Sequence, residues 1–274
     1  MIKCDLKLMD GIKKYNYLDK YLTKIRAQGR YAFTLEELKV EFKLTYNTLN
    51  QALYRLKSKK EIAQVRQGFY VIIPPEYSKQ RILPPYLFID DLMKSLDKFY
   101  YVGLLSAAAL YGAAHQQPME YFVIVKKPAP RSINNDKLKI NFFAKKELLQ
   151  EGIVQRRTPV GYMNVSSPEL TALDLFDTNK FGINRITTVL QELAEEIKSA
   201  NLLKTAKQCT NTAAIQRLGY VLEWLQEDKL ANSLEKVLNE RTSFPVPLSP
   251  QKEKKGEIDS RWKIIKNMEI ESDL

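Results

Sequence analysis

The fold of the N-terminal part is decided by Thr34–Ile73, which reads TLEELKVEFKLTYNTLNQALYRLKSKKEIAQVRQGFYVII. Thr34 and Glu37 have the spacing of a capping box, in which each satisfies a backbone N–H of the other, so a short helix is expected to begin here. After a tight turn, Thr45 can cap a longer helix that runs to about Ser58. The sequence therefore predicts two consecutive helices separated by a turn.

The segments on either side complete a small domain. Upstream, Tyr15–Arg26 has apolar residues at helical spacing, Gly29 closes that helix, and Tyr31–Phe33 is a short extended stretch. Downstream, we predict a strand over Ile62–Val65, a hairpin turn at Arg66, Gln67 and Gly68, and a returning strand over Phe69–Ile73 that Pro74 and Pro75 end. This order of helix, strand, helix, turn, helix and hairpin resembles the winged helix-turn-helix.

The predicted helix Thr45–Ser58 has two different sides. Its apolar side consists of Leu49, Ala52, Leu53 and Leu56. Its other side carries Asn47, Asn50, Gln51, Tyr54 and Arg55, with Tyr46 in the first turn. A helix that is merely solvated usually carries Glu and Lys pairs, whereas amides and Arg form paired hydrogen bonds with adenine and guanine edges in the major groove of DNA. We therefore expect this helix to bind duplex DNA.

The candidate DNA-binding residues lie on this helix and on the hairpin. They are Thr45, Tyr46, Asn47, Asn50, Gln51, Tyr54, Arg55 and Lys57 on the helix, and Arg66 and Gln67 at the hairpin tip. Lys59 and Lys60 extend the basic run towards phosphates. The alternatives are that the amides are simply solvated, that Tyr46 and Tyr54 pack on a neighbouring element, and that the lysines only favour a helix end.

The distribution of charge supports a polyanionic partner for the N-terminal segment. The 274 residues carry a formal net charge of +11. Residues 1–80 hold 16 Lys or Arg and 8 Asp or Glu, an excess of +8, so the other 194 residues share +3. A local field of that sign attracts phosphates and supports salt-dependent binding to nucleic acid.

The rest of the chain predicts a second, larger domain. Residues 76–90 follow the Pro-Pro pair at 74–75 and contain a second pair at 84–85. We predict that they form a Pro-rich connector between residues 1–75 and a domain at 91–241. In that domain we predict helices at 89–96, 103–111, 166–176, 186–197, 202–209, 212–224 and 230–238, and strands at 121–125, 138–143, 154 and 162–165. Residues 242–274 form a Pro-rich arm and a terminal segment, Trp262–Ile265, that is either a strand or a docked loop. The fold class is α+β, with a mixed, mostly helical C-terminal domain.

Several kinds of site are disfavoured by composition. His115 is the single histidine and lies in a predicted loop, so a multi-histidine metal site is excluded and a catalytic role is poorly supported. Cys4 and Cys209 are too far apart for a metal-binding spacing and too few for a disulfide framework, which fits a reducing cytoplasm. The sequence contains no Gly-rich phosphate loop. We predict no metal, no cofactor and no catalytic residue, and neither signal peptide nor membrane span.

The whole chain resembles the AbiEi family of bacterial antitoxins. The residues that carry the resemblance are GFYVIIPP (68–75), YYVGLLSAAALYGAAHQQP (100–118), VSSPELTALDLF (165–176) and DSRWKIIKN (259–267). Within the third segment, Ser167, Pro168 and Glu169 form a helix start, so Glu169 and Asp174 are interpreted as structural. Leu170 stands where relatives often carry a basic residue, which puts a polar function at that position in doubt.

The resemblance implies a type IV antitoxin that represses its own promoter by binding repeats in it. It also implies a functional partner, a co-encoded nucleotidyltransferase-like toxin, with or without direct contact. Two other hypotheses remain: the C-terminal domain is an enzyme that modifies a partner protein, or it binds a small ligand that regulates DNA binding. The missing phosphate loop and acid/base pair argue against the enzyme.

Overall fold

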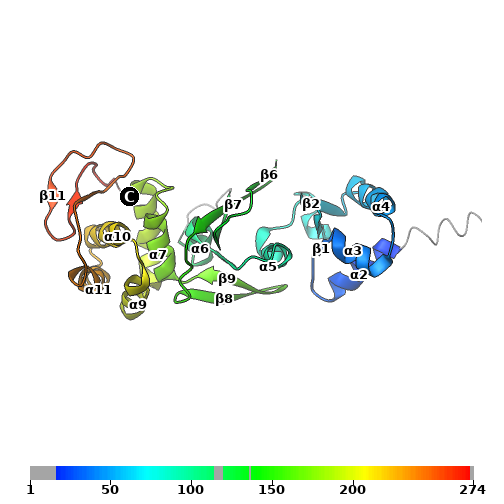
Figure 1. Cartoon of the computed structure of the whole chain (residues 1–274), viewed down its shortest axis with the longest axis horizontal. Helices are drawn as coiled ribbons and strands as arrows, with labels where there is room; N and C mark the ends of the chain where they lie inside the picture. The colour runs from blue at the N-terminus through cyan, green and yellow to red at the C-terminus, as the bar shows by residue number, and fades with distance from the viewer. Residues whose placement is uncertain (1–16, 114–119, 136, 272–274) are drawn as a thin grey trace, which may run out of the picture. The chain divides into compact units, whose positions relative to one another are not determined.

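The computed structural model describes residues 17–113, 120–135 and 137–271 (Figure 1). The chain divides into two compact units. The first comprises the chain up to Phe99 with Ile133–Lys139 and Arg156–Met163; the second comprises Tyr100–Ser132, Ile140–Gln155 and Asn164–Leu274. The predicted connector at 76–90 thus falls inside the first unit. The start of the first predicted helix, Cys4 and the loop around His115 lie outside the described residues.

The first unit contains the predicted elements in the predicted order. They are α2 (Tyr17–Ala27), β1 (Ala32–Thr34), α3 (Leu35–Phe42), α4 (Tyr46–Ser58), β2 (Ile62–Arg66) and β3 (Phe69–Ile72). The capping box is confirmed, because the Thr34 hydroxyl accepts from the Glu37 N–H at 3.1 Å and the Glu37 carboxylate accepts from the Thr34 N–H at 2.8 Å. Helix α3 ends where Lys43 takes a left-handed conformation with φ 49°.

A small antiparallel sheet and the three helices share one core. The strand order is β1-β3-β2, with Ala32 opposite Val71 and Ile62 opposite Ile72. The helices bury their apolar stripes against it, so that Leu38, Leu49 and other aliphatic residues lie beneath the stacked rings of Phe33 and Tyr70. This core fixes how α4 is rotated about its axis.

The connector is more ordered than an extended linker. Short 3₁₀ turns form at Pro75–Tyr77 and Pro85–Leu87, each with proline at its first position, where a proline's missing N–H and fixed φ are tolerated. Leu83 between them is fully buried. The following helix, α5 (Ile89–Ser95), contacts β1 and so belongs to the first unit.

Most of a six-stranded mixed sheet lies in the second unit, and its parts at 133–135, 138–139, 156–158 and 161–163 belong to the first. Its strand order is β6-β7-β5-β4-β9-β8, where β4 is antiparallel to β5 and parallel to β9, and β5 is parallel to β7. The strands are β4 (Tyr100–Val102), β5 (Tyr121–Lys126), β6 (Ile133–Asn135), β7 (Leu138–Lys145), β8 (Ile153–Thr158) and β9 (Gly161–Ser166). Strands β4 and β6 were not predicted. Each has only three residues, too few to show a periodicity, and each is held by pairing with its neighbouring strands.

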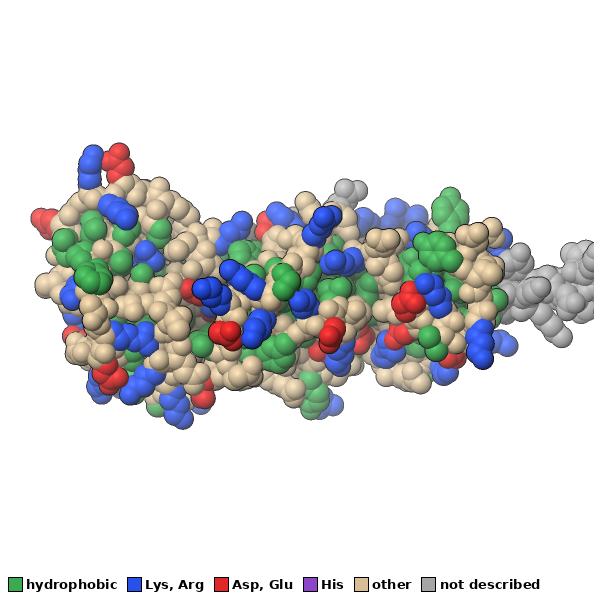
Figure 2. All heavy atoms as spheres, viewed as in Figure 1, with side chains coloured by type: hydrophobic (Ala, Val, Ile, Leu, Met, Phe, Trp, Pro, Cys, Tyr) green, Lys and Arg blue, Asp and Glu red, His purple; other side chains and the backbone are tan. Residues whose placement is uncertain are grey.

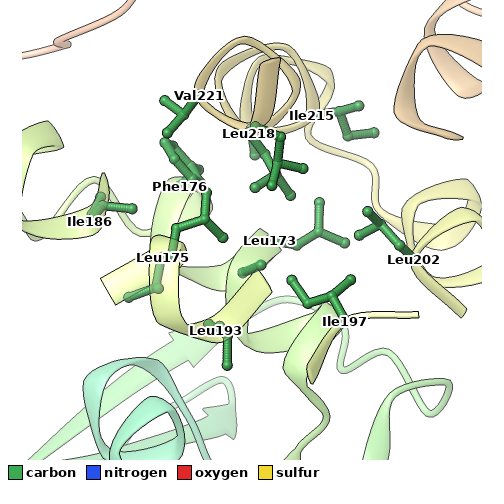
Figure 3. Close-up of a cluster of buried hydrophobic side chains, with 14 of the residues drawn as sticks. Leu173, Leu175, Phe176, Ile186, Leu193, Ile197, Leu202, Ile215, Leu218 and Val221 are labelled. Atoms are coloured by element: carbon green, nitrogen blue, oxygen red, sulfur yellow. The ribbon is translucent and has the colours of Figure 1, made fainter. Parts of the chain in front are cut away.

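Helices form the rest of the second unit, close to the predicted ranges. They are α6 (Leu104–Leu110), α7 (Pro168–Asp177), α8 (Ile183–Leu193), α9 (Ser199–Gln208), α10 (Thr212–Trp224) and α11 (Asp228–Asn239). Helix α7 is central, because every residue from Glu169 to Phe176 is buried and it contacts α6, α8, α9 and α10. Figure 3 shows Leu173 and Phe176 of α7 among Leu202, Ile215 and Leu218 of the surrounding helices. The expected mixture of helices and strands is confirmed.

The C-terminal segment is attached to the helices rather than forming a free arm. Within the predicted Pro-rich arm, β10 (Val246–Pro247) pairs with β12 (Ile264–Ile265), which also pairs with β11 (Ile258–Asp259). Leu248 is fully buried, so apolar burial outweighs the flexibility that the Pro-rich composition suggested. The terminal segment contains a strand, one of the two predicted alternatives.

Trp262 fastens this segment to α10. Its side chain is fully buried, and its indole N–H donates to the Glu223 carboxylate at 2.6 Å. The ring lies directly over Gly219, the position in α10 where a side chain would collide with it. The Arg261 guanidinium lies 5.1 Å from the centre of the ring and pairs with Glu223 and Glu235. Glycine is required at 219 for this close approach.

We predict that Gly219→Ala destabilises the protein. Alanine normally favours a helix over glycine, but here its Cβ would overlap the Trp262 ring, and such overpacking costs about 1 to 3 kcal/mol. The free energy of unfolding in urea measures the effect. Lys236→Ala, at an exposed position of the neighbouring helix α11, is the control. An unchanged stability of Gly219→Ala would refute the close packing.

Candidate nucleic-acid interface

The position of α4 follows from its two ends and its buried side. Thr45 is the N-cap, and its hydroxyl accepts from the Thr48 N–H at 3.4 Å. Leu49, Leu53 and Leu56 are at most 5% exposed, so this side of the helix faces the core. The remaining side is left on the surface of the first unit.

An outer line of four side chains runs along the exposed side of α4. Asn47, Gln51, Tyr54 and Ser58 are spaced by four, three and four residues, which places them within about 60° of one another around the helix. All four are exposed, and Tyr54 is 69% exposed. Helix α4 contains no acidic residue. Ser58 was not among the predicted residues. Its spacing of eleven residues from Asn47, close to three helical turns, places it on the same side of the helix.

The other predicted residues of α4 flank this outer line. Asn50 is half-buried. The Lys57 ammonium donates to the side-chain amide oxygen of Gln64, on β2, at 3.3 Å. Thr45 is exposed, and Arg55 is exposed on the opposite flank. The packing alternative is therefore wrong for Tyr54. Tyr46 is 54% exposed, with the Lys39 ammonium 5.8 Å from its ring centre.

The hairpin places the last two predicted residues at one end of a groove. Gln67 and Gly68 form the turn, where Gly68 has φ 75°, and Gln67 is exposed. Arg66 is half-buried, and its Nη1 has no hydrogen-bond partner among the described residues. Within the first unit, the groove of about 920 Å³ is lined by Arg66, Tyr46, Lys39, Arg30 and residues of α5. Arg66, at the hairpin tip, is thus less exposed than the sequence suggested.

Charge alone does not identify one binding face. On the face drawn in Figure 2, Lys and Arg side chains are scattered and interspersed with acidic ones. In the first unit, Arg30 donates to Glu37 at 2.9 Å and Lys24 pairs with Glu41 at 3.3 Å. The chemistry of the outer line of α4 is the more specific indication of a ligand.

A second group of charged residues is buried in the second unit. Lys145 of β7 contacts Asp174 at 2.5 Å and Asp177 at 2.7 Å, both on α7. Tyr101 of β4 donates to Asp174 at 2.7 Å, and the Asn211 amide donates to Asp177 at 2.6 Å. Asn211 also caps α10. This charged cluster joins the sheet to two helices, in keeping with the structural interpretation of Asp174.

The members of the charged cluster shift one another's pKa values, and burial raises the pKa of Asp174 against the opposing effects of Lys145 and Tyr101. Burial lowers the pKa of Lys145, but the two carboxylates outweigh it and raise the pKa above its ordinary value. Burial alone would raise the pKa of Asp177, yet Lys145 and Asn211 bring the pKa below its ordinary value. Glu169 is also buried and accepts from the Lys198 N–H at 3.0 Å, so it too has a structural partner. Leu170 is fully buried, which leaves no room for a polar role there.

Other kinds of site find little support in the described part of the chain. There, no group of three or more His, Cys, Asp or Glu side chains could hold a metal ion. No helix in the described ranges is long and apolar enough to cross a membrane. Cys209 is a buried free thiol, and burial raises its pKa.

The comparisons with known proteins identify the second unit. Residues 101–224 match the family model of the AbiEi antitoxin C-terminal domain. This match confirms, for that part of the chain, the resemblance to the AbiEi antitoxins stated above. No curated protein matches the chain.

A solved structure has a similar fold. The RV2827C protein from Mycobacterium tuberculosis is similar over 92% of this chain and 90% of its own, with a TM-score of 0.65. The two sequences are 15% identical, so the likeness concerns the fold. It extends over both units.

We predict that Lys145→Met strongly destabilises the second unit. Removing the cation leaves two buried carboxylates unpaired, which costs on the order of 3 to 5 kcal/mol. The defect should shrink as the pH falls from 7 to 4, because without Lys145 the folded state takes up protons that neutralise these carboxylates. Urea unfolding at both pH values measures it, with the exposed Lys146→Met as the control. A loss below 1 kcal/mol would contradict the role of the cluster.

Proposed function

We propose that residues 17–73 form a winged helix-turn-helix that binds duplex DNA, and that this antitoxin represses its own promoter. The observation that carries the proposal is the outer line of α4: exposed amides and a tyrosine on a helix without a single acidic residue. Phosphates would repel carboxylates, and amides pair with base edges. A helix selected only for solubility has no reason to exclude Asp and Glu.

The remaining features of the first unit support the same function. In a winged helix-turn-helix the helix after the turn enters the major groove and the hairpin touches the backbone. Here α4 is that helix, and Lys57, Lys59 and Lys60 lie at its C-terminal end. Arg66 and Gln67 occupy the hairpin. The excess of +8 within residues 1–80 supplies the sequence-independent attraction.

The AbiEi domain supplies the second half of the proposal. An antitoxin of this family implies a toxin, and we propose that the partner is a co-encoded nucleotidyltransferase-like protein of a type IV system. The domain's buried charged cluster and central helix α7 are accounted for by folding. We therefore assign it no catalytic residue, and the antitoxin acts as a regulator.

We predict that Asn50→Ala combined with Gln51→Ala weakens binding to the promoter more than binding to unrelated duplexes. Gln51 loses its pair of hydrogen bonds to a base, which costs about 1 to 3 kcal/mol of discrimination, while phosphate contacts are retained. Footprinting and titration at fixed salt measure both affinities. Gln208→Ala, an exposed glutamine at the end of α9, is the matched control. Wild-type promoter affinity in the double variant would show that α4 is not the reading helix.

The same double variant separates repression from neutralisation. In cells carrying a promoter reporter and the toxin gene under independent control, it should derepress the reporter yet still rescue growth, because the second unit is intact. If the AbiEi domain neutralises the toxin, Lys145→Met should still repress the reporter but should no longer rescue growth. Loss of rescue by Asn50→Ala with Gln51→Ala, at equal protein levels, would show that antitoxicity requires DNA binding.

A further inference from the structure

The outer line of α4 carries a particular combination of hydrogen-bonding groups. Asn47 and Gln51 lie one turn apart and present carboxamides, each with an acceptor oxygen and a donor nitrogen. Tyr54 follows one turn later with an exposed ring, and the Ser58 hydroxyl donates to the Tyr54 backbone carbonyl at 3.0 Å. The groups free to meet a base are therefore two amides and one aromatic ring.

Amides and aromatic rings match A·T pairs better than G·C pairs. In the major groove adenine shows an acceptor, N7, beside a donor, the N6 amino group, and one carboxamide satisfies both. Guanine shows two acceptors, N7 and O6, which are best met by the two donors of Arg or Lys. Thymine adds a methyl group that takes an apolar contact. The outer line contains no Arg or Lys.

The cations of α4 are displaced to its flanks. Arg55 lies about 70° around the helix from the centre of the outer line, nearest to Gln51, and Lys57 is directed to Gln64 on β2. On the flanks of a helix within a groove, the nearest acceptors are phosphates, which fix register without reading sequence. The base-reading chemistry is thereby left to the amides and the tyrosine.

We propose that α4 selects operator half-sites whose central base pairs are A·T, with Asn47 and Gln51 pairing to adenines and Tyr54 contacting a thymine methyl. This rests on the proposed DNA-binding function and adds the class of DNA that the site prefers. The test is a selection from a randomised duplex library by the full-length chain, followed by titration of the selected duplex. We expect enrichment of about three consecutive A·T pairs, roughly one base pair for each of the three contacting side chains.

Base analogues distinguish reading by these side chains from a preference for A·T-rich DNA shape. Replacing adenine by 7-deazaadenine removes only the N7 acceptor, and replacing thymine by uracil removes only the methyl group. Each change at one enriched position should weaken wild-type binding on the order of tenfold, which corresponds to about 1.4 kcal/mol. Gln51→Ala should become insensitive to 7-deazaadenine at one position, and Tyr54→Ala to uracil at another. Ser58→Ala, on the same outer line, should keep the wild-type pattern.

The possible results separate the two proposals. Enrichment of G·C pairs, or analogue effects that are the same in wild type, Gln51→Ala and Tyr54→Ala, would overturn the A·T assignment while leaving DNA binding in place. Failure of the chain to bind any duplex would overturn DNA binding and the base preference together. Position-specific loss of analogue sensitivity in the two variants would support both.

Discussion

The buried carboxylate of Asp174 constrains much of the second unit. A buried charge is tolerated only when it is paired and hydrogen-bonded. Here Lys145 of β7 pairs with Asp174, and Tyr101 of β4 donates a hydrogen bond to it. The same cation holds Asp177, which fastens the residue that caps α10. One ionic contact thus sets the register of the sheet against the helices, and the apolar side chains of Figure 3 then pack around that arrangement.

The first unit depends on a different balance. It is small, and its core consists of apolar stripes from three short helices over a narrow sheet. That core leaves the opposite side of α4 uncovered, so its exposed residues are under no packing constraint. Burial decides which side of the helix faces inwards, and the residues that it leaves outside are the ones available to a partner.

The AbiEi domain has its polar groups largely directed into its own structure: Glu169 to α9, Asp174 to the sheet, and Arg241 to backbone carbonyls near Cys209. The first unit has the unusual surface chemistry. The polar groups available to a partner are therefore concentrated on α4 of the first unit.

By itself the sequence determined the local structure: the capping box, the helices to within a few residues, the hairpin turn and the two sides of α4 are all encoded by neighbouring residues. It also determined family membership, through motifs spread along the chain. Only the tertiary structure decided that Lys145 meets Asp174, that Trp262 rests on Gly219, that Asn50 and Arg66 are partly covered, and that Leu248 is buried. Strands β4 and β6 likewise needed their partners. These features depend on contacts between residues tens of positions apart, and local periodicity carries no information about which distant groups will meet.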